Sequence, residues 1–577
     1  MRPLRRVAAA ALLALLVACS PAPPAPAPSP PVAEDDEPTE VVVAVDGIGA
    51  GFNPHLLAHT STVTTALATL VLPSVFQPVG DGTLQLDRAV ATSAEVVSQD
   101  PFTVSYELNL EASWSTNAPI AAEDFVYLWE RMRGEPGVTR AAGYQVITDI
   151  RSRAGGKAVD VVFDEPYPAW RELFANLLPA HLLKDAPGSW TAALANGLPA
   201  SGGPFRIGAV DRARGEVVLA RNDVYWDTPT VLDQLVLRRL DAAATAAGLR
   251  SGDVDIALPA ADPAVRAALS GVAPAPRVQQ APRPTVLELV LRADSGPLAP
   301  LRVRQGIAAI VDRGAVRAAV APDALPADAF GPAPSEPGYA PTVPETVRPD
   351  PEAAQERLTA AGWTREPDGR WASEGEPVRL VVGAAAERPD DVRVAELVAE
   401  QLDAAGIDTT VAAPPATALF GQGRPPADAV ESTATPTPIP AATSTPPPSA
   451  RTGPDDGEPV TVDITVTPRA AGGAVGVTLA SRYACPEPEP ETPAPPASSF
   501  CLPVLDLVLD RLVTDDDAQR RATAENLLWQ WLPALPLYQP VTLVVSTPAA
   551  DTATGVRPGP FRSGPLTGAQ EWSEPAG

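Results

Sequence analysis

The chain has 577 residues, of which 45% are hydrophobic, and it carries a formal net charge of −27 at pH 7. Its length exceeds what one hydrophobic core normally organises, so we expect two or three lobes. The strong negative charge argues against nucleic acids and anionic lipid headgroups as the main partner, because both repel an acidic surface.

The N-terminus has the features of an export and anchoring segment. A short basic stretch and an apolar run lead to residues 16–19 (LVAC), and the next stretch of the chain is dominated by Pro and Ala. This pattern resembles the signal peptide and lipobox of a bacterial lipoprotein, and the run is too short to span a bilayer. We predict a signal peptide over residues 1–18, a lipidated Cys19 on the extracytoplasmic face of the cell membrane, and a Pro-rich tether over residues 19–38.

The first structural elements come after the tether. Residues 40–45 (EVVVAV) predict a buried strand, and a Gly-rich turn ends it. A helix is predicted to begin near residue 121, because four large apolar residues recur at helical spacing and form one stripe. These residues are Phe125, Leu128, Trp129 and Met132.

A βαβ unit is predicted farther along the chain. Residues 378–382 and 407–411 have the pattern of strands, and residues 391–405 between them have the pattern of a helix. A crossover helix places two such strands parallel in one sheet, so at least one lobe is α/β. Upstream, Asp350 and Pro351 have the types expected at the N-cap and first turn of another helix.

The only cysteines besides Cys19 are Cys485 and Cys501. An exported compartment permits oxidation, and the Pro-rich residues between them lack a packing pattern of their own. We predict a disulfide between Cys485 and Cys501; a zinc site is the alternative, but no histidine lies near them in sequence. Residues 424–454 are rich in Pro, Thr and Ser and predict a disordered excursion.

Five motifs occur in a fixed order over some 500 residues and together resemble the family 5 extracellular solute-binding proteins of ABC transporters. Each motif is weak alone, but the ordered set is specific. The motifs are residues 112–125 (ASWSTNAPIAAEDF), residues 202–205 (GGPF) with 219–226 (LARNDVYW), residues 251–257 (SGDVDIA), residues 297–313 (PLAPLRVRQGIAAIVDR) and residues 535–538 (LPLY).

The resemblance implies a type II periplasmic-binding-protein fold. Two α/β lobes are then joined by two crossing segments, near residues 286–291 and 535–545, and an inserted third domain accompanies one lobe. The implied division is lobe 1 over residues 39–77, 197–284 and 534–577, the inserted domain over residues 78–196, and lobe 2 over residues 285–533.

The resemblance also implies the function. A small-molecule ligand binds in the cleft between the lobes, which close around it, and an ABC permease receives it. The leading interpretation is a monomeric lipoprotein of an importer that binds a peptide or similar polar solute, without cofactor or catalytic activity. We expect ligand contacts at Phe52 and Asn53, after the first strand, and at Ser201, Gly202 and Gly203, where missing side chains let backbone amides approach a ligand.

Two other interpretations stay open. Residues 427–436 (ADAVESTATP) lack the aromatic segment that is common in peptide binders of the family. The chain therefore also resembles a divergent actinobacterial branch linked to phosphatidylinositol mannoside and lipoarabinomannan synthesis, and a glycolipid ligand or a regulatory role is the alternative. In the third interpretation, His55 and His59 bind nickel from one helix face, although no third ligand is evident. The absence of a Gly-x-Ser-x-Gly motif argues against a serine hydrolase.

Overall fold

Two mixed sheets form the frame of this computed structural model, which describes residues 38–80, 82–421, 461–485 and 500–575. The predicted signal peptide, Cys19, most of the tether and the excursion over residues 424–454 lie outside the described residues. Residues from Thr39 onward form one compact unit. Within the described residues no helix is both long and apolar enough to cross a membrane.

The first sheet has seven strands in the order β12-β22-β11-β1-β10-β9-β8. Its central strand β1 (Glu40–Val45) matches the predicted strand and runs parallel to β10 and β11. Alternate β1 residues are buried against helices on opposite faces, as a continuous apolar strand requires. The other strands are β8 (Phe205–Asp211), β9 (Glu216–Arg221), β10 (Gln234–Arg239), β11 (Ile256–Leu258), β12 (Arg277–Pro282) and β22 (Val541–Ser546).

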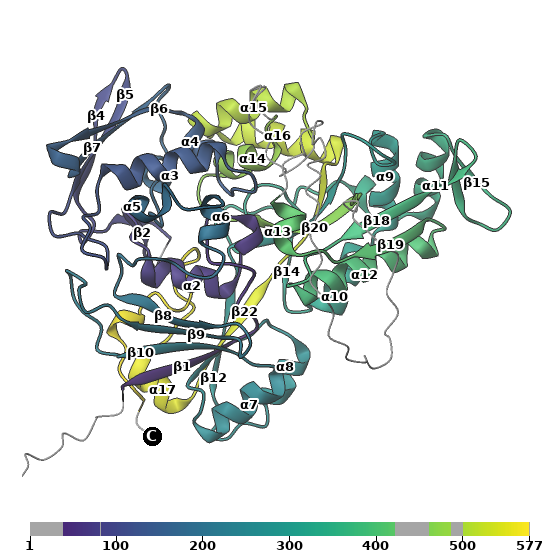
Figure 1. Ribbon diagram of the computed structural model, residues 1–577. Helices are drawn as coiled ribbons and strands as arrows, with labels where there is room; N and C mark the ends of the chain where they lie inside the picture. Colours follow the sequence, from purple (N-terminus) through teal and green to yellow (C-terminus); the bar gives the residue numbers. More distant parts are fainter. Residues whose placement is uncertain (1–37, 81, 422–460, 486–499, 576–577) are drawn as a thin grey trace, which may run out of the picture. The chain divides into compact units, whose positions relative to one another are not determined.

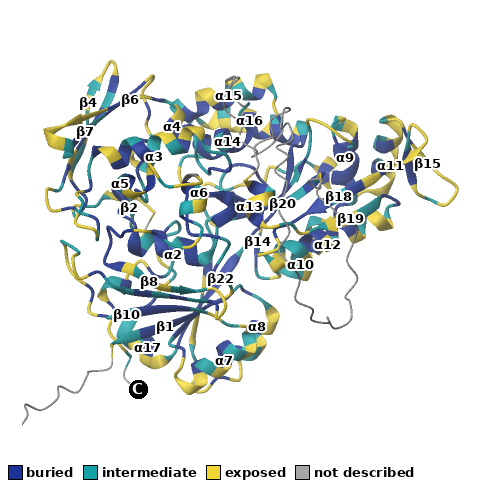
Figure 2. Cartoon of the chain, in the orientation of Figure 1, coloured by how far each residue is buried: buried dark blue, intermediate teal, exposed yellow. Residues whose placement is uncertain are grey.

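Helices α7 (Ala242–Ser251) and α8 (Pro263–Leu269) cover one face of this sheet (Figure 1). Their residues Leu249 and Leu269 share a buried cluster with Val42 and Leu543 of the sheet. Figure 2 shows the strands β1 and β22 as mostly buried and the outward sides of α7 and α8 as exposed. The sheet is therefore the centre of the first lobe.

The second sheet has six strands in the order β14-β21-β13-β20-β18-β19. Strands β18 and β19 are parallel and are joined by α12 (Pro389–Ala404), which confirms the predicted βαβ unit. This sheet is the centre of the second lobe. Its strands are β13 (Thr285–Leu291), β14 (Leu325–Pro326), β18 (Arg379–Gly383), β19 (Asp408–Ala412), β20 (Ile464–Ala470) and β21 (Ala534–Gln539).

Two connections cross between the sheets, near the predicted places. Strand β12 of the first sheet leads into β13 of the second, and β21 of the second leads back into β22 of the first. Arg283 donates its backbone N–H to the oxygen of Pro540 at 2.8 Å, so the connections touch. This pair of crossings is the hinge of a two-lobed binding-protein fold, which confirms the predicted fold class.

A third sheet is built from residues that lie between β1 and β8 in sequence. It consists of β4 (Ala91–Gln99), β5 (Phe102–Leu108), β7 (Ala158–Phe163) and β6 (Ile147–Arg153), all antiparallel. Helix α3 (Ala122–Gly134) packs on β6 and carries the predicted stripe, in which Phe125, Leu128 and Met132 are buried and Trp129 is half-buried. The residue boundaries of the inserted domain and of the two lobes stay predictions.

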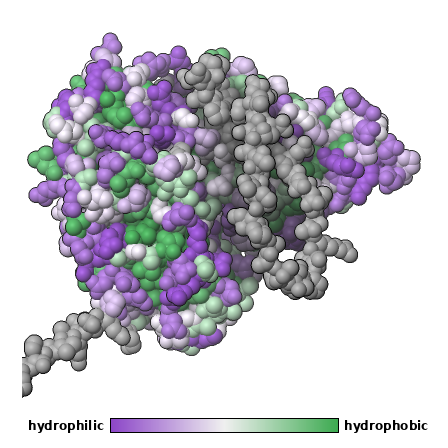
Figure 3. Space-filling view, in the orientation of Figure 1, coloured by the Kyte–Doolittle hydropathy of each residue, from purple (hydrophilic) through white to green (hydrophobic). Residues whose placement is uncertain are grey.

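Short elements complete the fold. Asp350 caps α11 (Pro351–Ala360) by accepting hydrogen bonds from Glu352 N and Ala353 N, as predicted. A small sheet consists of β15 (Trp363–Arg365), β16 (Trp371–Ser373) and β17 (Glu376–Pro377). The side of the molecule that carries β15 has a mostly hydrophilic surface in Figure 3. The remaining helices and strands are η1 (Leu57–His59), α2 (Thr62–Val71), β2 (Phe76–Pro78), β3 (Leu84–Leu86), α4 (Ala142–Gln145), η2 (Ala154–Gly156), η3 (Trp170–Glu172), α5 (Ala180–Leu183), α6 (Ser189–Ala193), α9 (Leu301–Ile310), α10 (Arg313–Val320), η4 (Glu345–Val347), α13 (Ala416–Phe420), α14 (Val475–Tyr483), α15 (Pro503–Thr514), α16 (Ala518–Trp531), α17 (Pro548–Thr554) and η5 (Ala569–Glu571).

The two cysteines other than Cys19 are joined, as predicted. A disulfide links Cys485, just after α14, to Cys501, just before α15. The backbone N–H of Cys485 also donates to Asp506 of α15 at 2.7 Å. The bond therefore fastens the end of one helix to the beginning of the next.

Candidate ligand-binding cleft between the lobes

A cavity of about 920 Å³ lies at the hinge and is lined by both lobes. Its wall in the first lobe is formed where β1, β10 and β11 end, at Asp46, Asp241 and Pro259. Its wall in the second lobe is formed after β18, at the beginning of α12. Open α/β sheets bind ligands beyond the carboxyl ends of their parallel strands, and the cavity occupies this position for both sheets. We call this space the main cavity.

Carboxylates outnumber guanidinium groups in the wall of the main cavity. An ionised carboxylate only accepts hydrogen bonds, so this wall favours ligands that carry hydroxyl or ammonium groups. Negative charge also repels a purely anionic ligand. The carboxylates are those of Asp46, Asp241, Asp262, Glu336, Glu387, Asp390 and Asp391, and the guanidinium groups are those of Arg283, Arg388 and Arg562.

Two of these carboxylates lie in the first turn of α12. Burial raises the pKa of Asp391 to about 6, against the pull of Arg388, and burial also raises the pKa of Asp390. Across the hinge, Arg283 donates from Nη2 to Asp46 Oδ2 at 2.7 Å. The hinge side of the cavity thus holds one satisfied ion pair and two carboxyl groups whose ionised form is costly.

Arg388 connects the two lobes beside the cavity. It stands at the beginning of α12 and donates from Nη2 to the carbonyl oxygens of Leu57 at 2.7 Å and Thr60 at 3.3 Å. Its guanidinium lies 5.1 Å from the centre of the Phe420 ring. Leu57 and Phe420 also belong to one buried apolar cluster, so α13 packs on η1.

A second contact joins the region of the third sheet to the second lobe. Glu172 accepts a hydrogen bond from the backbone N–H of Ala474 at 2.6 Å. It also forms an ion pair with Arg140, whose Nη1 lies 3.2 Å from the carboxylate. Arg140 in turn donates from Nη2 to the carbonyl oxygens of Ala471, at 3.0 Å, and Gly472. Gly472 lines the main cavity, so this second set of polar contacts also lies next to it.

A smaller cavity of about 200 Å³ adjoins the main cavity. The two share part of their walls, including Thr65, Arg562 and Ser563. The smaller space is bounded by α2, by residues near α4 and η3, and by the end of β20. We call it the side chamber.

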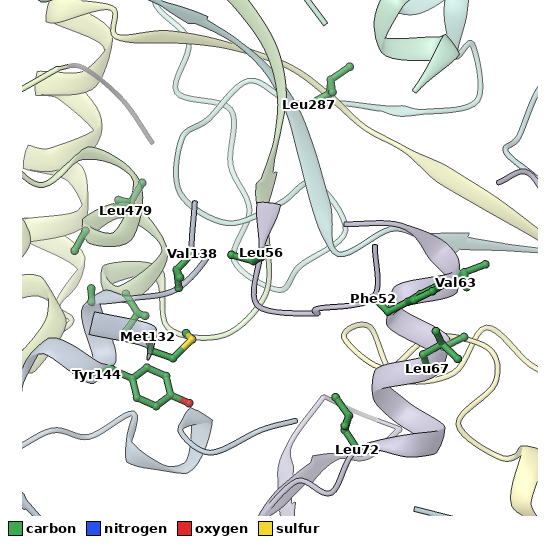
Figure 4. Close-up of a cluster of buried hydrophobic side chains, with 14 of the residues drawn as sticks. Phe52, Leu56, Val63, Leu67, Leu72, Met132, Val138, Tyr144, Leu287 and Leu479 are labelled. Carbon is green, nitrogen blue, oxygen red and sulfur yellow. The ribbon is translucent and has the colours of Figure 1, made fainter. Parts of the chain in front are cut away.

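The sequence-predicted contacts Phe52 and Asn53 are not in the wall of either cavity. Both side chains are fully buried. Phe52 packs in the apolar cluster with Val63 and Leu67 of α2, as Figure 4 shows, and its N–H donates to Leu194 O at 3.0 Å. Asn53 instead organises the turn before η1, accepting from the N–H of His55 at 3.0 Å. Both residues thus pack within the protein in this structure, and ligand contact at these two positions stays a prediction.

The predicted contacts Ser201, Gly202 and Gly203 are also buried away from both cavities. Ser201 donates from Oγ to the carbonyl oxygen of Val71 at 3.0 Å, at the end of α2. A Cβ added to Gly203 would lie 2.3 Å from Leu70 O. The missing side chain of Gly203 thus allows close packing against the end of α2, and ligand contact at these three residues stays a prediction.

His55 and His59 each have one ring nitrogen in contact with another protein group. His55 Nε2 lies 3.0 Å from Asn176 O, and its ring stacks on Trp190. His59 Nδ1 accepts from Asn53 N at 3.1 Å. Burial lowers the pKa of each imidazole to about 4, so both are neutral at pH 7. Within the described residues, no group of three or more His, Cys, Asp or Glu side chains is placed to hold a metal ion.

The sequence-based reasoning missed the acidic and basic residues at the start of α12. Arg388, Asp390 and Asp391 come directly after the first strand of the predicted βαβ unit. The rule that ligands bind beyond the carboxyl ends of parallel strands applies to them. Arg562 gave no such signal, because it reaches the cavity from a C-terminal segment that comes after α17 and carries no motif.

Known proteins resemble this chain in sequence. The model of the bacterial extracellular solute-binding proteins, family 5 (middle region), matches residues 85–445. The probable monoacyl phosphatidylinositol tetramannoside-binding protein LpqW of Mycobacterium tuberculosis is 37% identical over 484 residues, which cover 78% of this chain and 71% of LpqW. The oligopeptide-binding protein OppA of the same organism is 29% identical over 341 residues, which cover 55% of this chain and 56% of OppA.

Solved structures resemble it in fold. The oligopeptide-binding protein AppA from Bacillus subtilis, in complex with a nonapeptide, superposes with a TM-score of 0.73 at 16% identity, over 94% of this chain and 100% of AppA. The murein tripeptide-binding protein MppA of Escherichia coli gives a TM-score of 0.70 at 17% identity, over 94% of this chain and 99% of MppA. With the family match over residues 85–445, these findings show that the chain belongs to the bacterial extracellular solute-binding proteins of family 5.

Proposed function

We propose that this protein captures the mannosyl headgroup of a phosphatidylinositol mannoside between its lobes, as a lipoprotein on the outer face of the cell membrane. The observation that carries the proposal is the main cavity of about 920 Å³, whose lining residues include seven Asp and Glu residues. A mannosyl headgroup offers many hydroxyl donors, and carboxylates accept strong hydrogen bonds from hydroxyl groups. The 37% identity to LpqW over 78% of the chain supports the same ligand class.

Capture works through closure. A ligand in the main cavity touches α12 of the second lobe and the ends of β1 and β10 of the first lobe at once. These contacts are complete only when the lobes are together, so the ligand stabilises the closed state over the open one. The contacts of Arg388 with Leu57 and Thr60 add to that state.

A peptide is the second candidate. Carboxylates also bind the ammonium group of a peptide, and the 29% identity to OppA over 55% of the chain supports a peptide ligand. An ABC permease is then the expected partner. Permease and ATPase genes beside this gene would support import, and a gene standing alone would favour the glycolipid role.

Isothermal titration distinguishes the two candidates. The probes are the deacylated headgroup of phosphatidylinositol tetramannoside and a series of di- to pentapeptides. We expect the headgroup to bind, and Asp391→Asn to weaken binding by about tenfold or more, because a hydrogen bond to a charged group contributes about 1.5–3 kcal/mol. Glu396→Gln is the control on the same helix, since Glu396 pairs with Arg393 and does not line the cavity.

The outcomes of this titration are distinct. Binding of peptides alone would replace the first candidate with the second. If neither probe class bound and no compaction appeared in X-ray scattering, solute capture in the main cavity would be refuted.

Membrane attachment is tested separately. The sequence LVAC at residues 16–19 predicts lipidation of Cys19. Cys19→Ser is expected to release the protein from the membrane fraction or leave it unprocessed. A cleaved C19S form that stays with the membrane would contradict the anchor.

A further inference from the structure

The side chamber differs from the main cavity in the sign of its charge. Three guanidinium groups line it, from Arg140, Arg171 and Arg562, and within the described residues Glu172 is the one carboxylate in its wall. His55 also lines it but is neutral, because burial lowers its pKa to about 4. A net positive chamber therefore opens beside a net negative cavity.

Glu172 does not neutralise this positive charge. Its Oε2 lies 3.2 Å from Arg140 Nη1 and 3.5 Å from Arg562 Nη1, and its Oε1 accepts from Ala474 N. One carboxylate is thus shared by two guanidinium groups and a backbone amide. Burial, and after it the charge of Arg562, lowers the pKa of Arg140 to about 10, so its positive charge is held at a cost.

Two of the guanidinium groups keep donors for a ligand. Arg562 lies in the shared wall of both spaces. Within the described residues, its guanidinium makes one polar contact, the ion pair with Glu172 at 3.5 Å. The guanidinium of Arg171 lies 4.1 Å from the centre of the Trp170 ring. Among the residues that the structure describes, Arg171 has no hydrogen-bond or ion-pair partner. Stacking holds its planar group in place while its N–H donors stay open.

We propose that the side chamber is an anion subsite of the interlobe site, in which Arg562 and Arg171 bind a phosphodiester or carboxylate of the ligand. This inference rests on the proposed function. The hydroxyl-bearing or ammonium-bearing part of the ligand lies in the main cavity, and the anionic group lies across the shared wall at Arg562. Bidentate pairing of guanidinium with phosphate or carboxylate supplies the specificity. The opposite charges of the two spaces fix the direction in which a ligand lies.

Matched probes test the subsite in the full-length protein. The deacylated tetramannoside headgroup with its glycerophosphate is compared with the inositol tetramannoside that lacks it, and a tetrapeptide with a free carboxylate is compared with its C-terminal amide. For the ligand class that binds, the anionic member of the pair is expected to bind at least tenfold more tightly than its neutral counterpart. This preference is expected to weaken as salt increases, because exposed charges are screened.

Variants assign the preference to residues. Arg562→Gln is expected to lower the preference for the anionic over the neutral probe by about tenfold to a hundredfold. Arg171→Gln is a second variant that breaks no ion pair within the described residues. Arg557→Gln is the control, because Arg557 lies on the same C-terminal segment, pairs with Asp551 at 2.9 Å and lines neither space.

The results separate this inference from the proposed function. Equal binding of the anionic and neutral members, with R562Q and R171Q like R557Q, would overturn the anion subsite and leave solute capture standing. Failure of every probe to bind would overturn both. A preference for phosphate alone, or for carboxylate alone, identifies which anion the chamber takes.

Discussion

Gln539 and Arg283 join the two crossing connections at the hinge. Gln539 donates from Nε2 to the carbonyl oxygen of Arg283 at 2.9 Å, and its Oε1 accepts from Ser335 N at 2.9 Å. The side chain is fully buried. The amide therefore links its own connection to the other connection and to the second lobe.

Replacing this amide tests its part in the hinge. Gln539→Leu leaves Arg283 O and Ser335 N without their partner, and each unsatisfied buried group costs about 1–3 kcal/mol. We expect the free energy of unfolding to fall by about 2–6 kcal/mol in urea denaturation. Gln519→Leu on the exposed side of α16 is the control and should change it by less than about 0.5 kcal/mol. Equal effects of the two changes would contradict the hinge role.

Arg388 is predicted to hold the lobes together. Arg388→Gln removes the donors to Leu57 O and Thr60 O, so the open state gains population. X-ray scattering of the ligand-free protein should show a larger radius of gyration than for the wild type. Arg393→Gln, whose exposed side chain pairs with Glu396 and Glu400 on the same helix, should leave the radius unchanged. An unchanged radius in R388Q would remove this contact from the closure mechanism.

Asp391 predicts a pH dependence of stability. Burial raises its folded-state pKa from the ordinary 3.8 to about 6, so between these values the folded chain binds more protons than the unfolded chain. Its contribution is therefore present below pH 3.8 and is lost as the pH rises through 6. The full loss amounts to about 3 kcal/mol. Asp391→Asn should remove this part of the slope between about pH 4 and pH 7.

The measurement is the free energy of unfolding of both forms at several pH values. Asp124, whose pKa burial also raises to about 6, contributes the same trend in both proteins, so the difference between them isolates Asp391. A difference that does not change with pH would show that Asp391 has an ordinary pKa.

The disulfide is predicted to stabilise the second lobe. Cys485 and Cys501 are 16 positions apart, and closing a loop of this size contributes about 3 kcal/mol in the chain-entropy model. Cys485→Ser together with Cys501→Ser should therefore lower the free energy of unfolding by about that amount. Alkylation with subsequent intact-mass measurement should find both thiols only after reduction. Two free thiols in the native protein would contradict the bond.

Local patterns predicted the frame of the fold well. The strand over residues 40–45, the unit of β18, α12 and β19, and the Asp350 cap all depend on neighbours in sequence, and the structure confirms them. Their signals are periodicity and capping, which a single sequence displays.

The candidate site could not be predicted in the same way. Gly203 has no side chain, but the space beside it is filled by Leu70 O, a contact that the sequence does not display. Arg562 enters the wall of the cavities from the C-terminal segment and faces Glu172, which is 390 positions earlier in the chain. Such long-range pairs are set by how lobes and segments pack, and their residues carry no local pattern.

A buried ion pair lies beside the hinge. Glu288 of β13 and Arg469 of β20 lie on adjacent strands, with Oε1 and Nε 2.6 Å apart, and both side chains are almost inaccessible. Tyr483 donates its hydroxyl to the other carboxylate oxygen of Glu288 at 3.1 Å. Removing one partner of such a pair leaves a buried charge uncompensated, which costs about 3–5 kcal/mol.

Glu288→Gln is therefore expected to lower the free energy of unfolding by about 3–5 kcal/mol in denaturant titration. Glu400→Gln, an exposed partner of Arg393, should cost less than about 1 kcal/mol and serves as the control. The double change Glu288→Leu with Arg469→Leu should cost less than the summed costs of Glu288→Leu alone and Arg469→Leu alone. Each single change leaves one charge of the pair buried, whereas the double change removes both. Additive costs in this cycle would mean that the two charges do not stabilise one another, and that the strands β13 and β20 are held by their apolar residues and backbone hydrogen bonds alone.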